Sequence, residues 1–321
     1  MRRFRRLAHG AAALALAVTL GACGSGVGDG GDEGGGGDEG SGASVASQLV
    51  LGGPPECPER PFCLPGLKET YGIEFRSFQP LDVGGPLTVK ALESGRIDVG
   101  LLFSTSSVIA DRGWVVLEDD RGLQTAENIT PVVRSEVADE EVTTLLDQVS
   151  AALDTETMTR LNGRVEIDNE TPAEVAKDFL SEQGISGGDA QGSGKITVGS
   201  VQFAENQIVA EMYAQVLREA GFDVDRKDVG SREILQPALE SGEVDVAPEY
   251  LGSLLLFLDP EAEASGDPQQ IRGELEPLLE ERDLVLLESS DANDTNAFVV
   301  TKETADRYGL ARVSDLAEPA E

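Results

Sequence analysis

Histidine and cysteine are scarce in this chain of 321 residues, which has one histidine, His9, and three cysteines, Cys23, Cys57 and Cys63. Past position 9 there is no imidazole to act as a general base, as the partner of a nucleophile, or as a metal ligand. Without histidine, so few thiols cannot build a zinc site. Carboxylates are numerous enough for a glycosidase-like acid pair, but nothing singles one out. We therefore expect no catalytic residue, no metal site and no cofactor.

Phosphate-binding loops and a basic surface are also missing. Neither GxxxxGK[ST] nor GxGxxG stands between a strand and a helix, and the glycine runs at 30–42 belong to low-complexity sequence. Acidic residues outnumber basic ones by 59 to 25, a formal net charge of −34. Such a surface repels nucleic acid and anionic lipid, so we expect no nucleic-acid partner. It suits a small cationic or zwitterionic solute, although most of the charge is typical of a solvated face.

The N-terminus has the pattern of a bacterial lipoprotein leader. Four arginines among the first six residues precede an apolar stretch at 11–20, which is too short to span a bilayer. The run Leu20-Gly21-Ala22-Cys23 matches a lipobox, which predicts a signal peptide at 1–22 and acylation of Cys23; a plain cleaved signal is the alternative. We expect an extracytoplasmic protein held at the outer face of the cell membrane only by its N-terminal lipid.

Two further segments follow from composition. Residues 23–48 are almost wholly Gly, Asp, Glu and Ser, which predicts a flexible tether with a reach of about 25–30 Å. In an oxidising compartment Cys57 and Cys63 favour a small disulfide loop over free thiols. The remaining chain is long enough for two lobes with a hydrophobic core.

One nine-residue sequence motif occurs twice in the chain. The segment 91–99 (ALESGRIDV) returns at 238–246 (ALESGEVDV) with seven identities in nine positions, and at the same register Phe103 corresponds to Tyr250. Each copy predicts the end of a helix, a glycine C-cap and a short strand. The aromatic residue then lies just past the carboxyl end of the strand, where open α/β sheets bind ligands. We expect two related lobes that each offer one ring to a shared cleft.

The rest of the chain alternates strands with helices, which is typical of the α/β class with mostly parallel sheets. A segment at 49–183 is followed by a linker without periodicity at 184–194 and a second segment at 195–321. Helices are expected at 64–71, 86–93, 140–161, 172–183, 204–220, 231–241, 271–281 and 301–308. Strands are expected at 48–53, 73–78, 114–117, 196–198, 222–225, 284–287 and 297–300.

Several motifs of the second segment resemble a known family. They are Gly199-Ser200 with Phe203 and Glu205, the Gly230-Ser231-Arg232 turn, the run from Gly242 through Pro248-Glu249-Tyr250, and Asp294-Thr295-Asn296 followed by Ser314-Asp315-Leu316-Ala317. Together they resemble the quaternary-ammonium (glycine betaine, choline and carnitine) substrate-binding proteins of osmoprotectant ABC importers. The resemblance implies a two-lobed, periplasmic-binding-protein type II-like fold with a two-crossing hinge, and ABC permease subunits as partners.

The segments stand in an order that differs from the family's. There, the Gly-Ser-x-x-Phe-x-Glu segment comes first, and Ser-Asp-Leu-Ala continues into a stretch like residues 49–56. We therefore expect a circular permutant, with 184–194 fusing the usual termini; two half-domains completed by a swapped dimer are the alternative. One lobe would then contain about 110–183 plus 195–292, and the other about 49–109 plus 293–321.

The resemblance also implies the cleft residues. Tyr250 and Phe103 match positions of the family's aromatic box, where cation–π attraction holds the ammonium group, while Asn296 stands where many members have tyrosine. Polar candidates for ligand contact are Gln202, Arg232, Arg60, Asp294, Ser104 and Thr105. The implied function is an importer's receptor for betaine-like osmoprotectants. A receptor of this fold for another polar solute (an amino acid, a polyol or ectoine) is one alternative, and a secreted enzyme is a weaker one.

Overall fold

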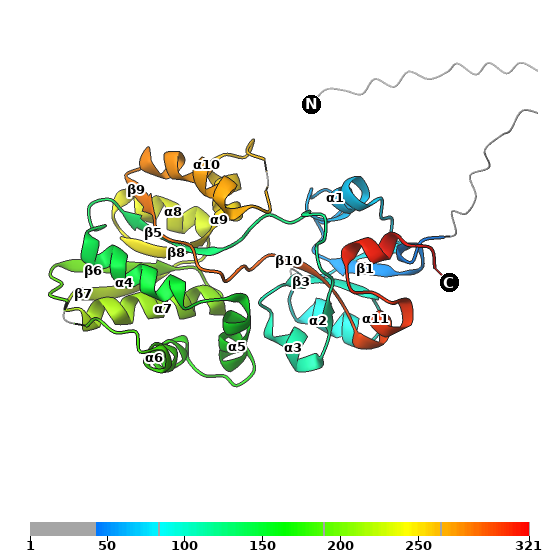
Figure 1. Cartoon of the computed structure of the whole chain (residues 1–321), viewed down its shortest axis with the longest axis horizontal. Coiled ribbons are helices and arrows are strands. Elements are labelled where there is room, and N and C mark those ends of the chain that lie inside the picture. Colours follow the sequence, from blue (N-terminus) through cyan, green and yellow to red (C-terminus); the bar gives the residue numbers. More distant parts are fainter. Residues whose placement is uncertain (1–42, 83, 189, 264, 321) are drawn as a thin grey trace, which may run out of the picture. The chain divides into compact units, whose positions relative to one another are not determined.

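The computed structural model describes residues 43–82, 84–188, 190–263 and 265–320, which belong to one compact unit, Ser41–Glu321 (Figure 1). The expected leader, Cys23 and most of the expected tether lie outside the described residues. Two five-stranded sheets, each with helices on both faces, organise the unit. Within the described ranges, no helix is both long and apolar enough to cross a membrane.

The first sheet has the strand order β2-β1-β3-β10-β4. Its strands are β1 Val50–Gly53, β2 Ser77–Pro80, β3 Val99–Phe103, β4 Val115–Val116 and β10 Asn296–Val300. Its helices are α1 Leu64–Gly66, which continues as a π-helix at Leu67–Tyr71, α2 Pro86–Glu93, α3 Ser107–Arg112 and α11 Lys302–Tyr308, with 3₁₀ turns at Ala46–Gln48 and Val313–Ala317. The apolar residues of α2 and α3 pack in one cluster, and those of the π-helix, α11 and the 3₁₀ turns pack in another.

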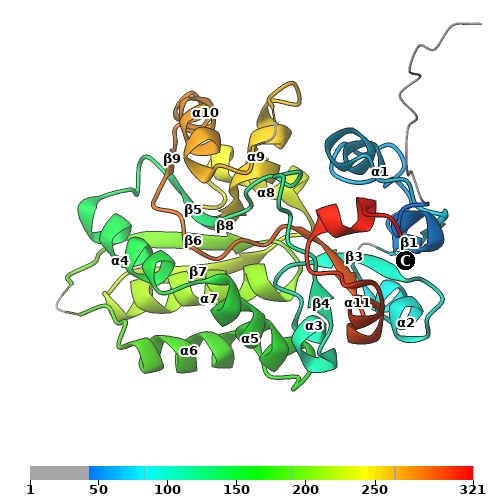
Figure 2. The same cartoon turned by 45° about the vertical axis from the view of Figure 1, so that its right-hand side comes forward.

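The second sheet has the strand order β7-β6-β8-β5-β9. Its strands are β5 Ile129–Arg134, β6 Lys195–Ser200, β7 Asp223–Asp228, β8 Val246–Tyr250 and β9 Leu284–Leu286. Helices α4 Glu140–Ala151, α5 Thr155–Glu166, α6 Pro172–Gln183 and α7 Ala204–Glu219 share one core with the sheet (Figure 2). Helices α8 Arg232–Ser241, α9 Leu251–Leu258 and α10 Pro268–Glu280 share the other.

Local signals in the sequence explain most of these boundaries. The expected helix at 140–161 is two helices, because Asp154 caps a new N-terminus by accepting from the Thr157 N–H at 2.7 Å. Helix α6 begins with a capping box between Thr171 and Glu174 and ends at Gly184, whose φ of 68° is the left-handed C-cap conformation. The helix expected at 64–71 ends in the same way at Gly72.

The α/β class and the two lobes are confirmed, and both sheets are mixed. In each sheet the first three strands pair in parallel, the fourth (β10 or β5) runs against them, and the fifth (β4 or β9) pairs antiparallel with the fourth and so runs with the first three. Strand β5 was not expected, because Pro131 argues against an interior strand. The fold accommodates it by placing Pro131 opposite Pro248, a pairing that needs no N–H from either residue.

The two sheets are built on the same plan. A spacing of 147 residues relates the two copies of the motif, and it also relates β1 to the end of β6. At the equivalent aspartates the hydrogen bonds coincide: Asp98 accepts from the Val50 N–H, and Asp245 accepts from the Thr197 N–H, both at 2.8 Å. The repeat therefore marks equivalent positions in two lobes of equal topology.

Two segments cross between the sheets, one between β4 and β5 and one between β9 and β10. They pair with each other at Asn128 and Asn293. We expected the first crossing at residue 110, which is wrong, because β4 at Val115–Val116 still pairs with β10 of the first sheet. The crossing lies within 117–128.

The expected tether also ends earlier than residue 48. Val45 and Ala46 are buried in the core of the first lobe, and the Val45 N–H donates to the Glu318 carbonyl at 2.9 Å. Ser44 pairs with Pro319 in an antiparallel bridge. Residues 43–48 therefore belong to the folded lobe, where they lie against residues 318–320.

The expected linker at 184–194 is attached to the second lobe at several points. The Gly192 N–H donates to the Ala220 carbonyl at 2.8 Å, and the Gly187 N–H donates to the Glu219 carboxylate at 3.3 Å. A Cβ at Gly187 would lie 2.2 Å from the Ala220 nitrogen, which explains why glycine is needed there. The segment therefore packs against the end of α7 instead of behaving as a free linker.

Candidate functional site

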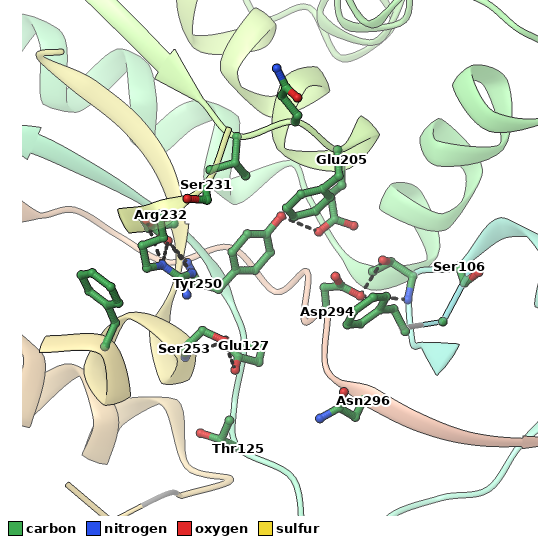
Figure 3. Close-up of a pocket in the computed structure, with 18 of the residues that line it drawn as sticks. Ser106, Thr125, Glu127, Glu205, Ser231, Arg232, Tyr250, Ser253, Asp294 and Asn296 are labelled. Carbon is green, nitrogen blue, oxygen red and sulfur yellow. Dashed lines mark hydrogen bonds and ion pairs between the residues drawn. The ribbon is translucent and has the colours of Figure 1, made fainter. Parts of the chain in front are cut away.

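A cavity of about 840 Å³ lies between the carboxyl ends of β1 and β3 in one lobe and those of β6 and β8 in the other. Both lobes and both crossing segments contribute to its wall (Figure 3). Its lining residues are Arg60, Phe62, Gly84, Phe103, Thr105, Ser106, Thr125, Glu127, Asn162, Glu166, Val201, Gln202, Phe203, Glu205, Gly230, Ser231, Arg232, Glu249, Tyr250, Ser253, Leu256, Phe257, Asp294 and Asn296.

Eight of the nine residues expected to contact a ligand line this cavity. The exception is Ser104, whose hydroxyl donates to the Asn293 carbonyl at 2.8 Å and accepts from the Thr295 N–H at 3.0 Å. The Ser104 side chain therefore ties β3 to the second crossing segment and does not face the cavity. Its neighbour Thr105 does line the cavity and is buried.

Tyr250 is the centre of a buried hydrogen-bond network. It ends β8, and its hydroxyl donates to the Glu205 carboxylate at 3.0 Å (Figure 3). The other oxygen of that carboxylate accepts from the Asn162 amide, also at 3.0 Å. On the opposite side, the Thr105 hydroxyl donates to the Asp294 carboxylate at 2.7 Å. The network thus joins the first turn of α7, helix α5, the end of β3 and the second crossing segment.

This network is short of positive charge. Burial, followed by the neighbouring Asp294 charge, raises the pKa of Glu205, and burial also raises the pKa of Asp294. Burial further raises the pKa of Glu127 to about 7, although Ser253 donates to its carboxylate from both its N–H and its hydroxyl. Burial is the main cause of each shift, and at Glu127 the nearby Arg232 charge offsets it only in part. A bound cation would supply the missing positive charge.

Arg232 is the cationic residue of the second lobe that lines the cavity. Its guanidinium group is already paired with the Glu249 carboxylate. The two side chains are joined by bonds of 3.1, 3.0 and 2.7 Å, and Glu249 is buried. This pair is geometrically of the bidentate kind, which fixes both groups in the wall. Arg232 was one of the polar candidates for ligand contact. It lines the cavity, and its guanidinium group bonds to a protein carboxylate there.

Five aromatic rings line the cavity: Phe62, Phe103, Phe203, Tyr250 and Phe257. Phe203 stacks on Tyr250, with ring centroids 5.8 Å apart and an angle of 26° between the planes. Phe103, Phe203 and Phe257 are each at least 37% exposed, so their faces are open to a ligand. Phe203 stood in the family-like motif but was not expected in the site, and nothing in the sequence marked Phe62 or Phe257 as site residues.

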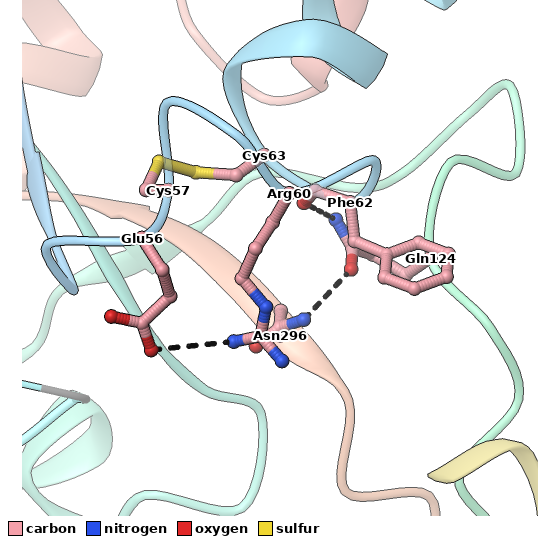
Figure 4. Close-up of a disulfide and its surroundings, with 7 residues drawn as sticks. All are labelled: Glu56, Cys57, Arg60, Phe62, Cys63, Gln124 and Asn296. Atoms are coloured by element: carbon pink, nitrogen blue, oxygen red, sulfur yellow. Dashed lines mark hydrogen bonds and ion pairs between the residues drawn. A yellow bond between two sulfur atoms is a disulfide. The ribbon is translucent and has the colours of Figure 1, made fainter. Parts of the chain in front are cut away.

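A disulfide loop forms the wall of the cavity on the side of the first lobe. Cys57 and Cys63 are bonded, and the loop between them presents Arg60 and Phe62 to the cavity (Figure 4). The Gln124 amide donates to the Phe62 carbonyl at 3.0 Å and accepts from the Asn296 amide at 3.1 Å. Asn296 is therefore held by the first crossing segment. Arg60 has only a loose contact of 3.9 Å with Glu56, so its charge remains available to the cavity.

The wall thus combines open aromatic faces, buried carboxylates and one exposed arginine. In the described part of the chain, no three His, Cys, Asp or Glu side chains are grouped so as to hold a metal ion. A family model described as the substrate-binding domain of the ABC-type glycine betaine transport system matches residues 42–182 and 194–321.

The chain belongs to this family. It is 36% identical over 156 residues to the glycine-betaine-binding protein of Pseudomonas aeruginosa, an alignment that covers 47% of this chain and 50% of that protein. It is 33% identical over 129 residues to the ergothioneine transport permease/ergothioneine binding protein EgtU of Helicobacter pylori, covering 40% and 23% of the two chains. With the glycine betaine-binding protein YehZ of Escherichia coli, identity is 29% over 133 residues, which covers 39% and 44%.

The chain spans half or less of the length of these curated relatives. Among solved structures, it aligns over 84% of its length with 89% of the probable amino-acid ABC transporter extracellular-binding protein YtmK of Bacillus subtilis. The identity is 10% and the TM-score 0.43, a similarity too distant to bear on function.

Proposed function

We propose that this chain is the extracytoplasmic receptor of an ABC importer, and that it binds a small betaine-like solute in the cavity and delivers it to the permease. The observation that carries this proposal is the meeting of aromatic rings from both lobes with the buried Glu205 and half-buried Asp294 carboxylates, neither of which forms an ion pair with a described residue, in one cavity. Rings attract an N-methylated ammonium group by cation–π interaction, worth about 1–2 kcal/mol per desolvated ring. The carboxylates add the negative field that such a cation needs.

Calorimetry with glycine betaine, choline and carnitine tests the ligand class. We expect micromolar-range binding of at least one of them. Phe203→Ala and Phe103→Ala should each weaken it roughly tenfold, because each removes one open ring. Tyr308→Ala is the matched control, since this aromatic residue packs in the first lobe away from the cavity. Binding that is absent for all three solutes, or unchanged in both ring variants, contradicts the proposal.

Delivery to a permease requires that the two lobes close around the solute. The two crossing segments pair with each other at Asn128 and Asn293, and the Asp294 N–H donates to the Glu127 carbonyl at 3.2 Å. A two-segment hinge of this kind permits closure without repacking either core. We expect the radius of gyration in solution to fall on ligand addition, and an unchanged scattering curve at saturation would argue against closure.

We also propose that Cys23 carries a lipid that anchors the receptor to the membrane. The support is the lipobox and the short apolar leader before it. In cells, Cys23→Ser should move the protein from the membrane fraction to the soluble extracytoplasmic fraction while ligand binding is retained. Mass spectrometry of the wild-type N-terminal peptide should show the acyl chains. An unmodified N-terminal peptide in membrane-bound protein would contradict this part of the proposal.

The order of segments supports a circular permutation of the family fold. Each sheet takes strands from both family-matched blocks of one chain: β10 completes the first sheet and β5 the second. The two blocks are separated only by residues 183–193, of which Gly187 and Gly192 donate hydrogen bonds to the end of α7. A monomer that binds ligand in a sedimentation experiment supports the permutant. A dimer that loses ligand binding on dissociation supports the swapped half-domains instead.

A second candidate ligand class is another small polar solute. It is favoured by Asn296, whose side chain is an amide where many choline and betaine binders have a ring, and which is fixed by Gln124. A thermal-shift screen with amino acids, polyols and ectoine separates the two candidates. Stabilisation by one of these and not by any betaine would favour the second.

A further inference from the structure

Asn162 has an unsatisfied oxygen at the cavity wall. The residue lies on α5, is only 3% exposed and lines the cavity. Its Nδ2 donates to the Glu205 carboxylate at 3.0 Å and to the Thr105 carbonyl at 3.2 Å. Its Oδ1 has no hydrogen-bond partner among the described residues. A buried amide oxygen without a donor costs about 1–3 kcal/mol, so the site is incomplete as it stands.

The oxygens around it are also acceptors. Glu205 is 2% exposed and already accepts from Tyr250 and Asn162, and Asp294 accepts from Thr105. Burial raises the pKa of both carboxyl groups, and the neighbouring Asp294 charge raises that of Glu205 further. Three acceptor groups that surround one part of the cavity call for a donor that also carries positive charge.

Among the described residues, the cationic side chains of the cavity wall do not supply that donor. Of the two arginines in the lining, Arg232 is engaged by Glu249, and Arg60 belongs to the disulfide loop of the first lobe. The Tyr250 and Thr105 hydroxyls already donate to Glu205 and Asp294. The missing donor therefore has to arrive with the ligand.

We propose that the cationic end of the solute carries an N–H group that donates to Asn162 Oδ1 between the Glu205 and Asp294 carboxylates. This inference rests on the proposed function for the location of the ligand and narrows its chemistry. A protonated secondary or tertiary amine, or a guanidinium group, donates to the oxygen and places one positive charge beside both carboxylates. A fully methylated ammonium provides the charge and no hydrogen bond, so it leaves Asn162 Oδ1 unpaired.

Matched ligand pairs that differ only by one methyl group test the proposal. We would measure N,N-dimethylglycine against glycine betaine, and N,N-dimethylethanolamine against choline, by calorimetry with the full chain at neutral pH. Both tertiary amines are protonated there and carry one N–H. We expect each to bind roughly tenfold more tightly than its trimethylated partner, because one buried acceptor gains a charge-assisted donor.

Two substitutions assign the preference to this oxygen. Asn162→Leu removes the acceptor in a side chain of similar size and should abolish the preference for the N–H member of each pair. Asn162→Asp keeps an oxygen at this position and should retain or increase the preference. Because the readout is a ratio of two affinities within one variant, a general loss of stability or affinity cancels. The melting temperature of each variant checks that it is folded.

The outcomes separate this inference from the proposed function. Wild-type protein that binds the trimethylated member as tightly, or more tightly, overturns the inference and leaves the proposed function standing. A preference that survives in Asn162→Leu overturns the role of Asn162. If no betaine or choline analogue binds but a guanidinium solute such as arginine does, the proposed function fails and the inference stands. If none of these cations binds, with or without an N–H group, both fail.

Discussion

Tyr250 and Phe103 occupy the same position in the two copies of the repeat, yet the structure treats them differently. Tyr250 is 6% exposed, packs in the core of the second lobe and donates to Glu205. Phe103 is 37% exposed, and no hydrogen bond can hold its ring. A duplicated scaffold thus offers one ring that is fixed before ligand arrives and one that is free to adjust. The second lobe carries the preformed half of the site.

The loops that follow the equivalent strands β1 and β6 differ more strongly. After β6 the chain enters α7 at once and places Phe203 and Glu205 in the cavity. After β1 it forms the disulfide loop instead and places Phe62 and Arg60 there. One side of the cavity is therefore acidic and the other carries a free cation. The difference gives the cavity a direction along which a zwitterion can align.

The largest expected contrast is between the contributions of the Tyr250 and Phe103 rings to the stability of the fold. Tyr250→Ala should lower the free energy of unfolding by about 3–5 kcal/mol, because it opens a buried cavity and removes one of the two donors to Glu205. Phe103→Ala should cost less than about 1 kcal/mol, since its ring is largely open to solvent. Urea titrations of both variants measure this. Equal losses would remove the distinction between a fixed and a free ring.

The equivalent aspartates give the next contrast. Asp245 is 8% exposed and pairs with Arg134 at 3.0 Å, whereas Asp98 is more exposed and lies 3.8 Å from Arg76. Both accept one N–H from a neighbouring strand. Asp245→Ala should cost about 2 kcal/mol, because it removes one of the two carboxylate partners of Arg134 (the other is Glu136) as well as the acceptor of a backbone N–H, and Asp98→Ala about 1 kcal/mol. The same urea titrations apply, and a larger loss in Asp98→Ala would contradict the expectation.

Whether a residue's role could be predicted from the sequence depends on whether that role follows from its near neighbours in the chain. The repeat predicted Tyr250 and Phe103, because helix end, glycine cap and strand are local signals that two lobes share. The motif containing Glu205 was also recognisable in the sequence. The burial of Glu205 against Tyr250, however, depends on how α7 packs on the sheet. Asn162 carries no signal at all: its turn of α5 meets Thr105 and Glu205 only through long-range packing.

The same reasoning explains the errors in the fold. Strand β5 contains Pro131, and only its pairing partner Pro248 makes that acceptable. The sheets were expected to be mostly parallel because alternating strands and helices imply crossovers, and the two strands that run the opposite way, β5 and β10, each enter their sheet from a crossing segment. Such reversals depend on connections between lobes, which periodicity within a segment does not report.

The acidic side of the cavity should also show a smaller effect, a dependence of protein stability on pH. The pKa of Glu127 in the fold is about 7, above its ordinary value of 4.5, because the group is buried. Its contribution to stability is therefore full below about pH 4.5 and is lost as the pH rises through about 7. In ligand-free protein, Glu127→Gln should raise the melting temperature relative to wild type by roughly 4 °C more at pH 8.5 than at pH 5.

The net charge of the whole chain also changes over this range, so the exposed Glu303→Gln serves as the control. Its melting temperature should stay parallel to that of the wild type. If Glu127→Gln runs parallel as well, or is favoured at the lower pH, Glu127 does not titrate as its burial implies. Scanning calorimetry at four or five pH values is sufficient.

The smallest expected effect tests the direction of the cavity. If the cation of the ligand lies beside Glu205, a carboxylate at its other end faces Arg60, whose one ion pair with a described residue is the 3.9 Å contact with Glu56. Arg60→Ala should then weaken glycine betaine about fivefold, or about 1 kcal/mol, and leave choline unchanged because choline has no carboxylate. Glu56→Ala is the matched control, since it frees Arg60 and should leave betaine binding equal or slightly tighter. An equal loss for both ligands in Arg60→Ala would mean that Arg60 shapes the wall without recognising charge. The zwitterion would then have to place its carboxylate elsewhere, and the contrast between the two loops would be structural only.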